Sequence, residues 1–82
     1  MLVKVYVSYK KGVLDPQGKV VHESLKSLGY NEFTGVRMGK YFEITIDDSV
    51  KDKNLIEEKV KAISEKVLSN PIMEVYSYEF VD

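Results

Sequence analysis

The chain has 82 residues, no cysteine and a formal net charge of −1 from twelve basic and thirteen acidic residues. This length predicts a single domain over residues 1–82, and a chain so short buries only ~60% of its unfolded surface. The composition excludes disulfides and thiolate sites, disfavours nucleic-acid binding and contains neither a signal peptide nor the ~20 apolar residues of a membrane span, so we expect a cytoplasmic protein.

The first two predicted elements are a strand over residues 2–9 and a helix over about 16–28. The strand alternates, and one of its faces carries Val3, Val5 and Val7. The apolar stripe of the helix consists of Val21, Leu25 and Leu28. Gly29 stands where a glycine commonly ends a helix.

Residues 33–47 predict a β-hairpin. Its second arm alternates Phe42, Ile44 and Ile46 with Tyr41, Glu43 and Thr45. The predicted turn is Met38-Gly39-Lys40. The first arm, Phe33 to Arg37, has a weaker pattern because Gly35 interrupts it.

A second helix and a last strand complete the chain. The helix covers about 52–69, with an apolar stripe of Ile56, Val60, Ile63 and Val67. The strand covers 72–81. One of its faces carries Ile72, Tyr76, Tyr78 and Phe80, and the other carries Met73, Val75 and Val81. The alternation leaves open which of these faces meets the helices.

The resulting order, β-α-β-β-α-β, predicts an α+β ferredoxin-like fold. Because each βαβ crossover is right-handed, both helices should cover one face of a four-stranded antiparallel sheet. The other face then has no cover. We expect Tyr6, Tyr41 and Thr45 there, with one face of the last strand, and interpret it as a self-association surface.

The residues offer no catalytic, cofactor or metal site. His22 is the single histidine, so neither a multi-histidine metal site nor a specific nucleophile–base pair can be assembled, and we expect it at the edge of the first helix stripe. The adjacent carboxylates Asp47-Asp48 and Glu57-Glu58 point apart on regular elements. No glycine-rich phosphate motif occurs.

The run Gly12–Gly18 is the most specific local feature. Asp15 is placed to cap the first helix and Pro16 suits its first position. This capping also opposes an anion site at the same amides. The apolar pair Val13-Leu14 has two readings, a docking surface or a hydrophobic staple packed on the first helical turns.

Four segments together resemble one family. They are Gly12–Gly18, Leu28–Glu32, Val36–Ile44 and Tyr76–Glu79. In this order they are similar to PurS, the small subunit of phosphoribosylformylglycinamidine synthase. Met38 and Phe42 stand where other aliphatic residues would be usual. The resemblance covers essentially the whole chain.

The resemblance implies a non-catalytic assembly subunit in de novo purine synthesis. Such a chain associates with itself, as a dimer or tetramer, and joins a large ATP-dependent synthetase subunit to a glutaminase subunit. It also implies a part in passing ammonia between them. No cofactor is expected on this chain, because ATP and magnesium belong to the large subunit, and neither nucleic acid nor membrane is an expected partner.

We expect partner docking through the loop before the first helix and through the predicted turn. The candidate residues are Val13, Leu14, Asp15, Gln17, Arg37, Lys40 and Tyr41. One alternative is a regulatory module that binds a small molecule. Another is an RNA-binding domain of the same element order, although the signature glycines are missing and Glu43 beside Tyr41 would repel phosphate.

Overall fold

The computed structural model describes residues 1–81 and has the element order β-α-β-α-β. The elements are β1 (Leu2–Tyr9), α1 (Pro16–Ser27), β2 (Gly39–Thr45), α2 (Lys53–Ile63), a π-helical turn η1 that continues it (Ser64–Leu68), and β3 (Glu74–Val81). Within this part of the chain, no helix combines the length and apolar character needed to cross a membrane.

The three strands form one antiparallel sheet in the order β2-β1-β3. In its register, Val5 of the central strand lies opposite Phe42 of β2 and Tyr78 of β3. Strand residues alternate between the faces, so the three valines of β1 share a face with Phe42 of β2 and with the aromatic residues of β3. The core therefore forms on this face.

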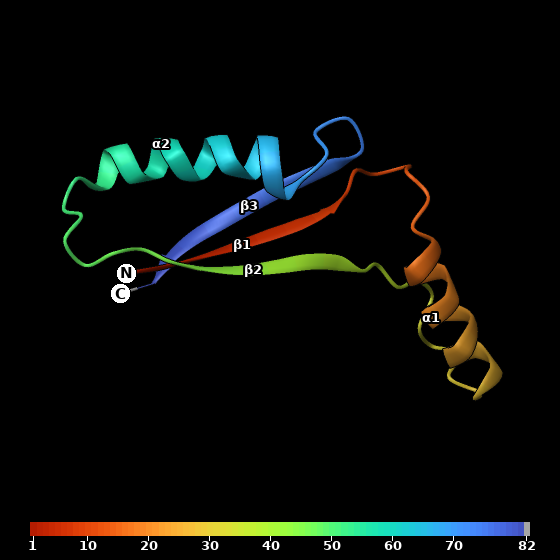
Figure 1. Cartoon of the computed structure of the whole chain (residues 1–82). Helices are drawn as coiled ribbons and strands as arrows, with labels where there is room; N and C mark the ends of the chain where they lie inside the picture. Colours follow the sequence, from red (N-terminus) through yellow and green to blue (C-terminus); the bar gives the residue numbers. More distant parts are fainter. Residues whose placement is uncertain (82) are drawn as a thin grey trace.

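Helix α2 covers that core face (Figure 1). The fully buried apolar residues are Val3, Val5, Val7 and Val60. Half-buried apolar residues surround them: Phe42, Ile44, Ile46, Ile56, Leu68, Tyr76, Tyr78 and Phe80. The Tyr78 hydroxyl donates to Glu57 Oε1 of α2 at 2.9 Å. The structure thus places the aromatic face of the last strand against the helix, the point that its alternation leaves open.

The prediction of a fourth strand at Phe33–Arg37 is wrong, and so is the predicted turn at Met38-Gly39-Lys40. The sheet has three strands, and β2 begins at Gly39. The reason is that backbone groups of residues 33–38 form hydrogen bonds with side chains of α1 and its cap residue instead of pairing with a strand. The Phe33 carbonyl contacts His22 Nε2 at 2.8 Å, and the Met38 amide donates to Asp15 at 2.7 Å.

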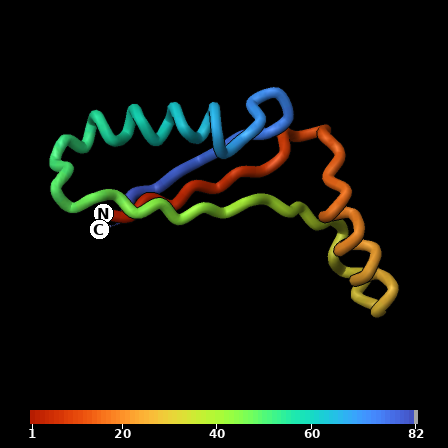
Figure 2. Tube along the Cα trace, viewed as in Figure 1, coloured from red at the N-terminus to blue at the C-terminus, as the bar shows by residue number. Residues whose placement is uncertain are grey.

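The prediction that both helices cover one face of the sheet is also wrong. Residues 10–38, which we call the arm, leave the sheet at the end of β1, and α1 lies beyond that end on the side away from α2 (Figures 1 and 2). The molecule measures 52 × 27 × 15 Å, with a radius of gyration of 16.5 Å. A compact chain of this length would have a radius of gyration of about 12 Å. The ferredoxin-like two-layer packing is therefore absent within one chain.

Candidate functional site at the arm junction

Asp15 joins the start of α1 to the start of β2. Its Oδ1 accepts from the Gly18 amide at 2.9 Å, which is the predicted helix cap, and its Oδ2 accepts from the Met38 amide at 2.7 Å. These amides, Gly18 first and then Met38, hold the pKa of Asp15 below its usual value because they stabilise the carboxylate. Asp15 thus links the segment that enters the arm to the segment that returns from it to the sheet.

Gly18 and Arg37 complete this fastening. A Cβ on Gly18 would stand 2.5 Å from the Val36 carbonyl oxygen, so only glycine lets α1 lie this close to the returning segment. Arg37 Nη2 donates to the Tyr9 carbonyl at the end of β1. The arm is thereby held at a fixed position relative to the sheet.

The lowered pKa of Asp15 predicts a pH-dependent contribution to stability. A depressed folded-state pKa stabilises the fold above the unfolded pKa of about 3.9, and this stabilisation is lost as the pH falls through the folded-state value. Asp15→Ala should therefore have a lower urea midpoint than the parent at pH 7, and the gap should narrow below about pH 4. A gap of the same size at pH 7 and pH 3 would contradict this role.

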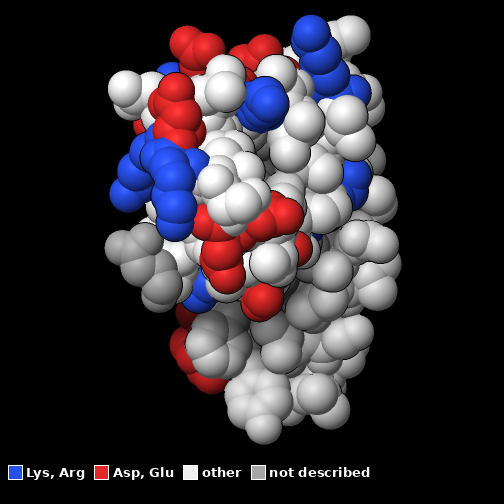
Figure 3. All heavy atoms as spheres, turned by 60° about the vertical axis from the view of Figure 1, so that its left-hand side comes forward, with Lys and Arg blue, Asp and Glu red and all other residues white. Residues whose placement is uncertain are grey.

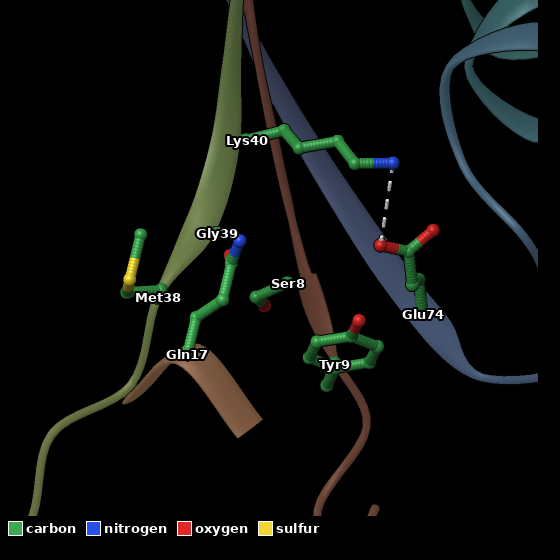
Figure 4. Close-up of a pocket in the computed structure, with 7 residues that line it drawn as sticks. All are labelled: Ser8, Tyr9, Gln17, Met38, Gly39, Lys40 and Glu74. Carbon is green, nitrogen blue, oxygen red and sulfur yellow. Dashed lines mark ion pairs between the residues drawn. The ribbon is translucent and has the colours of Figure 1, made fainter. Parts of the chain in front are cut away.

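A small cavity of about 50 Å³ lies beside this junction (Figure 4). Its lining residues are Ser8, Tyr9, Gln17, Met38, Gly39, Lys40 and Glu74. Glu74 is the buried charge here, with its side chain 9% exposed. It accepts from the Asn70 amide at 2.7 Å and lies 3.8 Å from Lys40 Nζ. The negative charge of Glu74 in the cavity is therefore compensated by the positive charge of Lys40.

Six of the seven predicted docking residues lie in or around the arm junction, in three groups. Asp15 and Arg37 make contacts inside the chain, and Gln17 and Lys40 line the cavity. Val13 is half-buried, whereas Leu14 is 70% exposed, which is not the burial that a hydrophobic staple would give Leu14. The structure thus leaves Leu14 free to meet a partner.

Tyr41 lies on the sheet face opposite α2, away from the cavity. Its ring stacks on Tyr6 with the centroids 5.3 Å apart, and its hydroxyl donates to Glu43 at 3.0 Å. Desolvation, followed by the Glu43 hydrogen bond and charge, raises the pKa of Tyr41 to about 12. Tyr41 and Lys40 are neighbours in β2 and so point to opposite faces, which places them on separate surfaces.

The sequence interpretation missed two kinds of residue. Glu74 was not singled out because nothing in the strand pattern shows that its carboxylate is buried. Val20 and Met38 were missed because Val20 lies outside the predicted stripe of Val21, Leu25 and Leu28, and Met38 was assigned to a turn. The adjacent apolar residues Val20 and Val21, which cannot both belong to the centre of one narrow stripe, were the available signal.

Possible metal ligands and surface charge are distributed as follows. In residues 1–81 no three His, Cys, Asp or Glu side chains gather as metal ligands. At the end of the molecule nearest the termini, basic and acidic side chains are intermixed (Figure 3). This view shows no single basic patch of the kind that nucleic-acid binding requires.

Comparison with known proteins identifies the family. A family model described as "PurS: Phosphoribosylformylglycinamidine (FGAM) synthase" matches residues 2–82. The PurS subunit of this synthase from Bacillus subtilis is 51% identical over 77 residues, which is 94% of this chain and 88% of that protein. The Synechocystis subunit is 33% identical, over 93% of this chain and 74% of that one.

Solved structures agree and include the arm. The B. subtilis PurS structure is 50% identical, with a TM-score of 0.79 over 95% of this chain and 94% of that chain. A chain in the structure of PurLQS from Thermotoga maritima is 27% identical, with a TM-score of 0.78 and 96% of both chains covered. With the fold, the near-complete coverage and the family model in agreement, the chain belongs to the PurS family of phosphoribosylformylglycinamidine synthase subunits.

Proposed function

We propose that this chain is a non-catalytic subunit that assembles the ATP- and glutamine-dependent ligase of purine synthesis in the cytoplasm. Its partners are a large synthetase subunit, a glutaminase subunit and further copies of itself, as a dimer or tetramer. ATP and magnesium act on the large subunit, and this chain helps to keep the ammonia path between the other two in register. The similarity to a chain in the PurLQS structure supports this proposal.

The observation that carries the proposal is the fastened arm. Contacts of Asp15, Gly18 and Arg37 hold residues 10–38 beyond the end of the sheet. Within residues 1–81, α1 does not pack on the sheet, so burial against the sheet does not explain this position. Such an arrangement exposes Leu14 and the outer side of α1. An extended, stiff arm with exposed apolar residues is suited to contact neighbours rather than to bind a small substrate.

The predicted docking residues have two different roles in this proposal. Leu14 and Gln17 are the groups that a large subunit would contact, and Val13, Lys40 and Tyr41 remain proposed contacts around them. Asp15 and Arg37 act by holding the loop in position. The arrangement therefore supports docking at the arm junction, with the internal contacts supplying its shape.

Assembly in solution tests the proposal. The chain is mixed with the synthetase and glutaminase subunits, glutamine, ATP and magnesium, and the mixture is passed over a sizing column. We expect all three proteins to elute together and the two larger ones to separate when this chain is omitted. Co-elution of the two larger subunits without it would overturn the assembly role.

A regulatory module is the second candidate, because the cavity at Glu74 and Lys40 is polar and partly enclosed. Its volume of about 50 Å³ holds little more than a few water molecules. The assembly role therefore accounts for more of the structure.

A further inference from the structure

The far end of the arm contains a second cavity, separate from the one at the arm junction. It measures about 260 Å³ and lies between α1 and the segment that follows it and turns back along it (Figure 1). Its lining residues are His22, Lys26, Asn31, Phe33 and Thr34. Pockets for small ligands usually occupy roughly 300–1,000 Å³, so the size of this cavity suits a small molecule or a single side chain.

Backbone contacts fix the shape of this cavity. Gly29 ends α1 with a φ of +91°, in the left-handed region that favours glycine, and so reverses the chain. The Tyr30 amide donates to the Leu25 carbonyl at 3.0 Å. His22 Nε2 lies 2.8 Å from the Phe33 carbonyl, which can only accept, so the ring donates to it. Both ends of the loop are thus attached to the helix, and the cavity is preformed.

The lining of this cavity contains basic and donor groups but no carboxylate. Lys26 supplies an ammonium group, Asn31 an amide and Thr34 a hydroxyl, all of which can donate. The two ion pairs of residues 1–81 lie elsewhere, so Lys26 has no carboxylate partner in this part of the chain. Glu32 stands between two lining residues in the sequence, but it does not line the cavity. The ligand that complements this lining is an anion.

The charge of the lining matches a carboxylate better than a phosphate ester. The lining carries one formal positive charge, on Lys26, with His22 counted as neutral. A carboxylate neutralises this charge. A phosphate monoester carries about −1.5 to −2 at pH 7 and would leave an excess of negative charge. That excess would lie beside the C-terminal end of α1, where the helix dipole already places partial negative charge.

An aromatic wall adds a second requirement for the ligand. Phe33 lines the cavity and is 49% exposed, and its ring centroid lies 6.3 Å from that of Tyr30. Contact with methylene groups of a ligand would remove part of this apolar surface from water. The lining therefore complements a molecule that combines a carboxylate with a short aliphatic chain.

We infer that the cavity at the far end of the arm binds a carboxylate that carries a short methylene chain. Lys26 binds the carboxylate through a charge-assisted hydrogen bond, Asn31 and Thr34 orient it, and Phe33 covers the chain. A free carboxylic acid and a glutamate side chain of another protein share this chemistry. The site goes beyond the assembly role, and the two fail independently.

The ring of His22 reports occupancy of the cavity, because this chain has a single histidine. Sodium butyrate is titrated into the full chain at constant pH and ionic strength, with sodium chloride as the exchanged salt, and the ring signals are followed by NMR. We expect a saturable shift. Sodium acetate lacks the methylene groups and should bind more weakly by about threefold or more. No saturable shift with butyrate, or equal binding of both salts, would overturn the inference and leave the assembly role intact.

Two lysine variants assign the binding to this cavity. Lys26→Gln should raise the butyrate dissociation constant by about fivefold or more, because it removes the charged donor. Lys19→Gln is the matched control, since Lys19 is exposed on α1 but outside the lining, and should change the constant by less than about twofold. The same constant in both variants would contradict a site at Lys26.

The assembled complex distinguishes the two sources of the carboxylate. The three subunits are passed over a sizing column in butyrate and, separately, in sodium chloride of equal ionic strength. If a glutamate side chain of a larger subunit occupies the cavity, butyrate and Lys26→Gln should both reduce co-elution. If the natural ligand is a free carboxylic acid, neither should change it. Reduced co-elution with Lys19→Gln to the same extent would contradict a specific contact at the cavity.

Discussion

Replacement of Gly18 by alanine is expected to destabilise the protein by about 2–3 kcal/mol, by crowding α1 against the returning segment of the arm. The added Cβ would stand 2.5 Å from the Val36 carbonyl oxygen and 2.6 Å from Asp15 Oδ2. Alanine normally favours a helix over glycine by about 1 kcal/mol. A loss of stability in Gly18→Ala would therefore indicate crowding, whereas a gain would indicate that helix propensity dominates.

Gly35→Ala is the matched control for this substitution. No atom lies within 4 Å of a Cβ built on Gly35, and its φ is not positive. Its stability should stay within about 0.5 kcal/mol of the parent in urea unfolding. Hydrogen exchange should accelerate in α1 of Gly18→Ala more than in β1. A Gly18→Ala chain as stable as Gly35→Ala would contradict the role assigned to this glycine.

The second large effect is expected from Leu14→Asp, on assembly and not on folding. Leu14 is 70% exposed, so its replacement removes little buried surface from the chain itself. An aspartate placed in an apolar contact would lose its hydration without a partner. We expect the concentration of chain that gives half-maximal glutamine-dependent activity to rise at least tenfold, which corresponds to about 1.4 kcal/mol of docking energy.

Val67→Asp is the control for Leu14→Asp. Val67 is similarly apolar and 74% exposed, but it lies on η1 and so outside the arm of residues 10–38. Its activity curve should overlap that of the parent, and both variants should keep the unfolding midpoint of the parent. Overlapping curves for both variants would exclude Leu14 from the docking surface. Arg37 is less suitable for this test because it donates to Tyr9 inside the chain.

Local sequence patterns predicted most of the individual elements. Asp15 caps α1 as expected, and the alternating valines of β1 form the buried face of the sheet. These features depend on neighbours within a few residues. The two helices and the antiparallel sheet of the predicted fold class are present, and the prediction failed at the fourth strand, where the alternation was weak. Gly35 interrupts Phe33–Arg37. The Phe33 carbonyl contacts His22 of α1, and the amide of Met38, the next residue, donates to the cap residue Asp15, so the segment does not pair with a strand.

The arm could not be predicted because its position depends on three distant contacts. Neither the hydrogen bond from Met38 to Asp15 nor the one from Arg37 to Tyr9 has a periodic signal in the sequence. The second glycine of Gly12–Gly18 has the same explanation, since its role is close approach to Val36. The family resemblance pointed to the correct family while the fold expectation was partly wrong.

The most direct measurement of the central claim compares two nitrogen donors for the assembled ligase. Product formation by the synthetase and glutaminase subunits is measured with and without this chain, once with glutamine and once with ammonia supplied directly. The account predicts that omission of the chain abolishes most of the glutamine-dependent rate and leaves the ammonia-dependent rate nearly unchanged. Equal glutamine-dependent rates with and without the chain would contradict it.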